Sequence, residues 1–135
     1  MMRLILLLLS TWLLASCSIP KPLIERIKEA GVMIVITRDT PTTYHKDKDG
    51  IKGVEYELVE LFAAQLGVKV KYVIPDSFDQ IIPMIVRGDA HFAAAGLTVT
   101  QKRRTQVKFT PAYQNITPQL VYLSGNKRPK KITDT

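Results

Sequence analysis

One short segment concentrates side chains that could bind a small anion. Positions 96–103 read Gly-Leu-Thr-Val-Thr-Gln-Lys-Arg, which places a glycine, two hydroxyls and a guanidinium within eight residues. Glycine lets the backbone approach a ligand closely, free N–H groups at the start of a helical turn bind anions, and arginine offers parallel donors to a carboxylate. The segment predicts a carboxylate-binding loop whose candidate residues are Gly96, Thr98, Thr100 and Arg103. A helix cap at Thr100 followed by solvated basic residues is the alternative explanation.

Other combinations of residues in the sequence are poor candidates for a catalytic site. Ser77, Asp89 and His91 have the residue types of a nucleophilic triad, but no glycine-flanked nucleophile turn accompanies them. Glu55 and Glu57 are two positions apart at the start of an expected helix, where they point apart and their charges stabilise the helix end. His91 lies within an apolar strand pattern, which is typical of a hydrogen-bonded core histidine. We therefore expect a binding chain, not an enzyme, with no metal and no cofactor.

The elements that position the loop alternate along the chain. Helices are expected at 23–30, 54–66 and 78–87, and strands at 32–37, 68–74 and 89–95. The uninterrupted β-branched run at 32–37 is typical of a strand covered on both faces, whereas the alternation at 68–74 is typical of a sheet edge. Right-handed crossovers convert this order into a three-layer α/β fold with a mostly parallel sheet. Ligands sit at the carboxyl ends of such strands, where the 96–103 loop begins.

Several local features complete this prediction. The segment 38–53 is expected to be a long loop with a turn or small hairpin at Asp49-Gly50. Pro83 conflicts with a regular helix, so the helix either begins near Asp79 or bends. Apolar residues at 54, 58, 61, 62 and 66 are expected to face the core. Further strands are expected at 107–109 and 119–123.

The first residues have the layout of an export signal. A basic start is followed by about a dozen apolar residues, fewer than the roughly 20 that a membrane span needs. Leu14-Ala15-Ser16-Cys17 resembles the bacterial lipobox, which implies cleavage after residue 16 and acylation of Cys17. Ser18 in place of aspartate favours the outer membrane over the inner one. Cys17 is the only cysteine, which excludes an intramolecular disulfide.

The charge balance is basic. There are 19 Lys+Arg against 12 Asp+Glu, giving a net charge of +7, while 46% of the residues are hydrophobic. This composition is typical of a chain that folds rather than of a disordered tail. No base-stacking aromatic side chains interleave with the basic clusters, so nucleic acid is not an expected partner. Anionic lipid headgroups or cell-wall polymers such as peptidoglycan fit an exported basic protein better.

The loop and its surroundings resemble a known family. The stretch AAAGLTVTQKRRTQVKFTPAY (93–113) is similar to the signature of family 3 solute-binding proteins, the amino-acid-binding clamshells of bacterial importers. Residues 53–58, GVEYEL, match the family's Gly-aromatic-Asp-x-Asp-Leu pattern in part. Several blocks resemble, more narrowly, the N-terminal module of membrane-bound lytic murein transglycosylases. The resemblance implies the first lobe of a periplasmic-binding-protein-like clamshell.

This resemblance also implies roles for the site residues. Arg103 would grip a ligand carboxylate, Thr98 would hydrogen-bond it, and Gly96 would offer its backbone carbonyl to a ligand amine. Thr100 would cap the turn or add a hydroxyl contact, and Tyr44 would form an aromatic wall over the ligand. The implied ligand is a small carboxylate, either an amino acid or a muropeptide.

The resemblance leaves three functions open. Lys102 stands where the family usually has an acid, which should favour acidic ligands, and Ala112 replaces a usual proline at the rim. The expected organisation is a signal peptide at 1–16, a lipidated tether at 17–22, an incomplete first lobe at 23–123 and an exit segment at 124–135. We expect a fragment, without a second lobe or a lysozyme-like domain, from a lipid-anchored periplasmic protein. An importer's binding lipoprotein and a non-binding remnant are the alternatives to a transglycosylase module.

Overall fold

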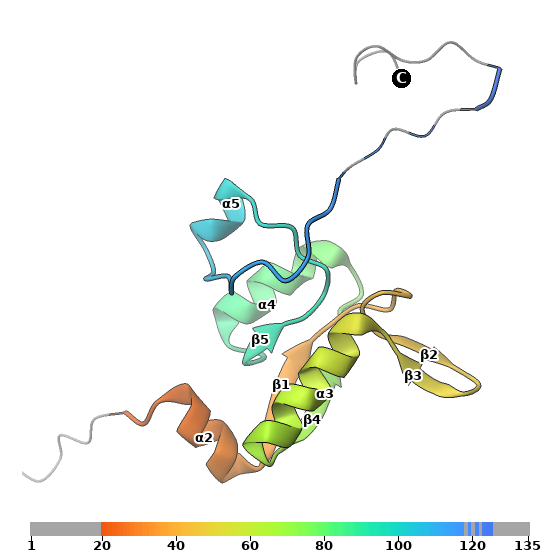
Figure 1. Cartoon of the computed structure of the whole chain (residues 1–135). Helices are drawn as coiled ribbons and strands as arrows, with labels where there is room; N and C mark the ends of the chain where they lie inside the picture. Colours follow the sequence, from red (N-terminus) through yellow and green to blue (C-terminus); the bar gives the residue numbers. More distant parts are fainter. Residues whose placement is uncertain (1–19, 118, 120, 122, 126–135) are drawn as a thin grey trace, which may run out of the picture.

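The computed structural model describes residues 20–117, 119, 121 and 123–125. The elements, shown in Figure 1, are α2 (Leu23–Ala30), β1 (Val32–Ile36), β2 (His45–Asp47), β3 (Gly50–Lys52), α3 (Val54–Leu66), β4 (Lys69–Val73), the 3₁₀ helix η2 (Phe78–Gln80), α4 (Ile81–Arg87), β5 (Phe92–Ala93) and α5 (Gln101–Arg104). None of the helices in these ranges is long and apolar enough to span a bilayer. The predicted signal peptide and Cys17 lie outside the described residues.

The sheet has the predicted parallel architecture. Its strand order is β4-β1-β5, with Val35 of β1 paired to Tyr72 on one side and to Phe92 on the other. The central strand β1 fully buries Met33 and Val35, as its β-branched pattern predicts. Strand β4 lies at an edge, which confirms the prediction from its alternating pattern.

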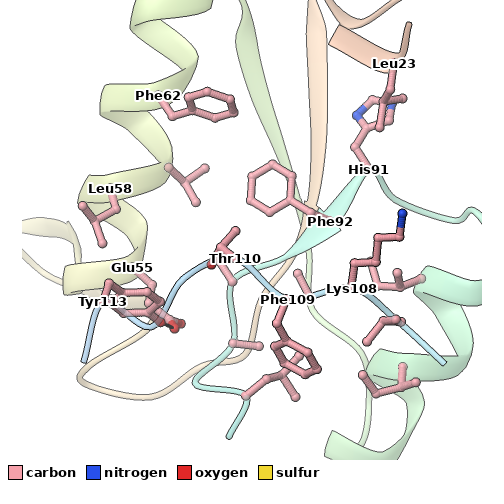
Figure 2. A pocket seen from close by; sticks show the side chains of 18 of the residues that line it. Leu23, Glu55, Leu58, Phe62, His91, Phe92, Lys108, Phe109, Thr110 and Tyr113 are labelled. Atoms are coloured by element: carbon pink, nitrogen blue, oxygen red, sulfur yellow. Dashed lines mark hydrogen bonds between the residues drawn. The ribbon is translucent and has the colours of Figure 1, made fainter. Parts of the chain in front are cut away.

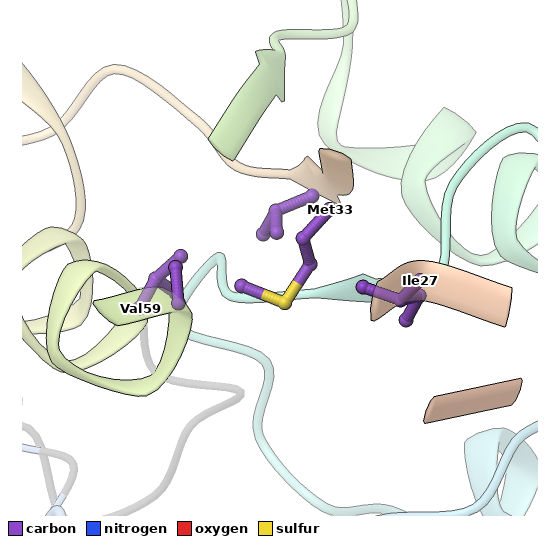
Figure 3. Close-up of a cluster of buried hydrophobic side chains, with 5 residues drawn as sticks. Ile27, Met33 and Val59 are labelled. Carbon is purple, nitrogen blue, oxygen red and sulfur yellow. The ribbon is translucent and has the colours of Figure 1, made fainter. Parts of the chain in front are cut away.

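Helices cover both faces of the sheet, so the predicted three layers are confirmed. On one face, Ile27 of α2 and Val59 of α3 pack against Met33 (Figure 3). On the other face, Ile81 of α4 packs into a second buried cluster with Ile36. Because successive strand residues point to opposite faces, β1 supplies both cores from one short run.

Two local predictions are also confirmed. Strands β2 and β3 form an antiparallel hairpin within the predicted loop. Pro83 is the third residue of α4, in the first turn, because η2 precedes the regular helix. A proline in the first turn removes no intrahelical hydrogen bond, so the helix needs no bend. At the start of α3, Gly53 has φ +142°, and a Cβ there would lie 2.3 Å from the carbonyl oxygen of Thr43.

Three predictions about the elements are wrong. Of the predicted core stripe of α3, only Leu66 packs against the core, whereas Leu61 is 70% and Phe62 39% exposed. Val54 and Leu58 are exposed too, because the helix turns Glu55, Val59 and Ala63 inward instead. Residues 107–109 form no strand, and neither do the described residues within 119–123. The strand predicted at 89–95 is reduced to the two residues of β5, since the chain pairs with β1 only there.

Candidate functional site

The loop after β5 is held in a defined shape by its own residues. Gly96 begins the loop with φ +62°, a left-handed conformation that favours glycine. The hydroxyl of Thr100 accepts a hydrogen bond from the backbone N–H of Arg103, so Thr100 caps α5. The guanidinium of Arg103 donates to the carbonyl oxygen of Thr98 over 2.8 Å. Four of the residues predicted for the site are therefore brought together at the carboxyl end of the sheet.

A buried carboxylate anchors the start of this loop. Glu55, only 6% exposed, accepts the backbone N–H of Gly96 at 2.9 Å from each carboxylate oxygen. It also accepts a hydrogen bond from the hydroxyl of Tyr113. Although Tyr113 is 60% exposed as a residue, desolvation of its hydroxyl together with this hydrogen bond raises its pKa well above the usual value. Glu55 thus joins α3, the loop and the segment after α5, a role that its position in the sequence did not indicate.

A second arginine, which sequence reasoning missed, lies beside the loop. Arg38 follows β1 at the carboxyl edge of the sheet, and its Nη2 would be 3.3 Å from a Cβ at Gly96. The guanidinium carbons of Arg38 and Arg103 lie 5.0 and 5.1 Å from the ring centroid of Phe78. Both are cation–π distances. The only sequence signal for Arg38 was its place directly after the central strand.

Tyr44 belongs to an aromatic cluster. Its ring centroid lies 5.7 Å from that of Tyr56 and 4.9 Å from that of Tyr72. The Tyr72 hydroxyl donates to Glu60 over 3.0 Å, and burial together with that bond raises the pKa of Tyr72. The cluster fixes Tyr44 against α3 and β4, and its contact with a ligand stays a prediction.

A large apolar cavity of about 780 Å³ lies next to the loop (Figure 2). Leu58 and Phe62 of α3 and Phe92 of β5 line it, and Glu55 and Tyr113 lie together at one end. Leu97 of the 96–103 loop lines it, whereas Gly96, Thr98 and Arg103 do not. The cavity therefore borders the loop without including its candidate carboxylate-binding residues, and Glu55 both lines the cavity and accepts the Gly96 N–H.

In the described part of the chain the candidate triad residues bond to other partners: Asp89 accepts from Arg87, and His91 bonds to the backbone. The histidine, cysteine and acidic side chains of this described part form no group of three or more that could hold a metal ion. The Nδ1 of His91 accepts the backbone N–H of Ile34 at 2.9 Å, and burial lowers the pKa of His91. The predicted hydrogen bond is present, but His91 is half-buried and lines the cavity instead of lying in the core.

Comparison with known proteins identifies relatives. The family described as bacterial extracellular solute-binding proteins, family 3, matches residues 32–132. Membrane-bound lytic murein transglycosylase F of Pseudomonas putida is 42% identical over 126 residues, which cover 92% of this chain and 26% of that protein. The enzyme of the same name from Stutzerimonas stutzeri is 43% identical over 123 residues, or 90% of this chain and 25% of that protein. The chain thus spans about a quarter of the length of these relatives.

Solved structures of solute-binding proteins are also similar to this chain. An ancestral cationic amino acid solute-binding protein is 33% identical, with a TM-score of 0.60 over 66% of this chain and 39% of that one. The arginine-bound form of domain 1 of ArgBP from T. maritima is 30% identical, with a TM-score of 0.54 over 59% of this chain and 64% of that one. The matched family covers most of this chain, and the parallel sheet with its carboxyl-edge loop has the fold of one lobe of such proteins. The chain belongs to the family 3 bacterial extracellular solute-binding proteins.

Proposed function

We propose that this chain is an extracytoplasmic binding module for a small carboxylate ligand, an amino acid or a cell-wall peptide. In this proposal it is the regulatory domain of a peptidoglycan lytic transglycosylase, and it binds ligand without itself cleaving peptidoglycan. The similarity to transglycosylase F over 92% of the chain supports the link to cell-wall cleavage.

The observation that carries the proposal is the loop that ends in Arg103. Thr100 caps the turn, the Thr98 carbonyl holds one guanidinium N–H, and the rest of the guanidinium is left for a ligand carboxylate. Donors held in place lose little conformational freedom on binding, which favours affinity. The neighbouring Lys102 and Arg104 are exposed, so the local potential is positive and attracts acidic ligands.

The test is calorimetric titration of the purified chain with amino acids and with cell-wall stem peptides. Arg103→Gln should weaken binding at least about tenfold, because a lost charged hydrogen bond costs about 1.5–3 kcal/mol. Arg104→Gln is the matched control, because Arg104 is an exposed arginine of the same helix α5. An equal loss of ligand affinity in Arg103→Gln and Arg104→Gln would contradict a specific role for Arg103. Lys102→Glu with unchanged affinity would refute the preference for acidic ligands.

An amino-acid importer's binding lipoprotein is the second candidate, favoured by the likeness to amino-acid-binding structures. Tighter binding of a free amino acid than of any stem peptide would select it. Domain 1 of the T. maritima protein was solved with arginine bound, which supports testing a single lobe alone. Absence of binding to every amino acid and peptide would leave the third candidate, a non-binding remnant.

We also propose that the chain is exported, acylated at Cys17 and held in the periplasm, at the outer membrane. The lipobox-like sequence before Cys17 supports this. Two or three acyl chains give durable anchoring, whereas one does not. Growth with labelled palmitate should label the wild type and leave Cys17→Ala unlabelled. A label retained by Cys17→Ala would reject acylation at this residue.

A further inference from the structure

Arg38 presents hydrogen-bond donors that the described chain does not use. Its Nε is buried and has no hydrogen-bond partner among the described residues. Its backbone is fixed, because the buried hydroxyl of Thr43 donates to the Arg38 carbonyl oxygen. A buried donor without a partner is rare in native proteins and calls for an explanation such as a ligand.

The two guanidinium groups share one aromatic ring. Arg38 and Arg103 lie 5.0 and 5.1 Å from the centroid of Phe78, and neither forms an ion pair within the described part of the chain. The sum of these distances is the greatest possible separation of the two guanidinium carbons. A peptide spans up to about 3.5 Å per residue, so a ligand of one to three residues can bridge them.

We propose that Arg38 is a second anion-binding residue of the loop site and that the ligand carries two acidic groups, one bound by Arg103 and the other by Arg38. This inference rests on the proposed carboxylate-binding function and specifies the ligand class. Two positive groups near each other repel unless an anion lies between them. Guanidinium is weakly hydrated and forms parallel bonds to carboxylates, which suits a partly buried site of this kind. The same charges oppose cationic amino acids.

The first test compares two ligands of nearly equal size, glutamate and glutamine, by titration of the purified full chain. Wild type should bind glutamate at least about tenfold more tightly, the effect of one charged hydrogen bond. Arg38→Gln should bring the two affinities together, whereas Arg104→Gln should leave the preference intact. A preference that survives Arg38→Gln overturns the inference but not the proposed function. Absence of binding to any amino acid or stem peptide overturns the proposed function and the inference together.

A second measurement does not depend on the ligand's identity. Sulfate binds guanidinium groups, so its binding at Arg38 and at Arg103 should raise the melting temperature of wild type in addition to its general stabilising effect. Arg38→Gln should lose part of this rise, and Arg104→Gln should keep it, because Arg104 is exposed. Arg38→Lys keeps the charge but not the planar guanidinium with its parallel donors, so we expect an intermediate rise in melting temperature. Equal rises in wild type and Arg38→Gln overturn the inference.

Discussion

Replacement of the buried Glu55 tests how the binding loop is positioned. Its carboxylate accepts hydrogen bonds from the Gly96 N–H and the Tyr113 hydroxyl. A hydrogen bond to a charged group is worth about 1.5–3 kcal/mol, and a glutamine retains only a neutral bond to Gly96. We therefore expect Glu55→Gln to lower the free energy of unfolding by about 1–3 kcal/mol. Urea unfolding followed by circular dichroism measures this loss as a shift of about 1 M in the midpoint.

Two comparisons make this prediction specific. Glu57→Gln removes an equivalent charge from the exposed side of the first turn of α3, so it reports the helix-dipole contribution of about 0.3–1 kcal/mol alone. Tyr113→Phe removes one hydrogen bond and should be coupled to Glu55→Gln by about 0.5–3 kcal/mol in a double-mutant cycle. The reasoning is refuted if Glu55→Gln costs no more than Glu57→Gln, or if the Glu55 and Tyr113 effects add independently.

Three further perturbations test the fold around the site. Gly53→Ala should destabilise by about 1–3 kcal/mol in urea unfolding, because the new Cβ meets the Thr43 carbonyl oxygen at 2.3 Å and φ is +142°. Stability should fall on acidification below pH 6.5, because the pKa of His91 is held below its ordinary value of 6.5 and the unfolded state then binds more protons. The loss, measured as a fall in melting temperature, reflects protonation of the His91 Nδ1, which accepts the Ile34 N–H in the folded state. Leu61→Lys should reduce the binding of a hydrophobic fluorescent dye, because the Leu61 side chain is 70% exposed.

Each of these has a matched control. Gly31→Ala places an alanine in the left-handed region at φ +66° with open space around its Cβ. If Gly31→Ala loses as much free energy of unfolding as Gly53→Ala, the clash with Thr43 is not the cause of the loss. His91→Gln should flatten the change in stability between pH 7 and 5, and an unchanged slope would assign it to other groups. Gln65→Lys adds the same charge to an exposed position of α3 and should leave dye binding unchanged. Equal reductions in both lysine variants would indicate charge repulsion instead of lost apolar surface.

Sequence reasoning succeeded where neighbouring residues decide the outcome. The β-branched run of β1 and a hairpin follow from local conformational preferences, and both are present, although the hairpin turns at Lys48-Asp49, one residue before the predicted Asp49-Gly50. The cap formed by Thr100 spans three residues and was predictable for the same reason. The prediction that the apolar stripe of α3 faces the core was mostly wrong, because periodicity shows that a helix has an apolar face but not what packs against it. Val59 and Ala63 are buried, while Leu61 is exposed.

By itself, the sequence determined the order of the elements, the parallel sheet and the position of the candidate loop at its carboxyl edge. These follow from local propensity, hydrophobic period and the handedness of crossovers. Only the tertiary structure decided that Glu55 is buried beside Tyr113, 58 positions away, and that Arg38 and Arg103 lie 5.0 and 5.1 Å from the ring centroid of Phe78. Side chains so distant in sequence come together only when the sheet and helices pack. Hydrogen bonding and charge at the site are therefore properties of the fold.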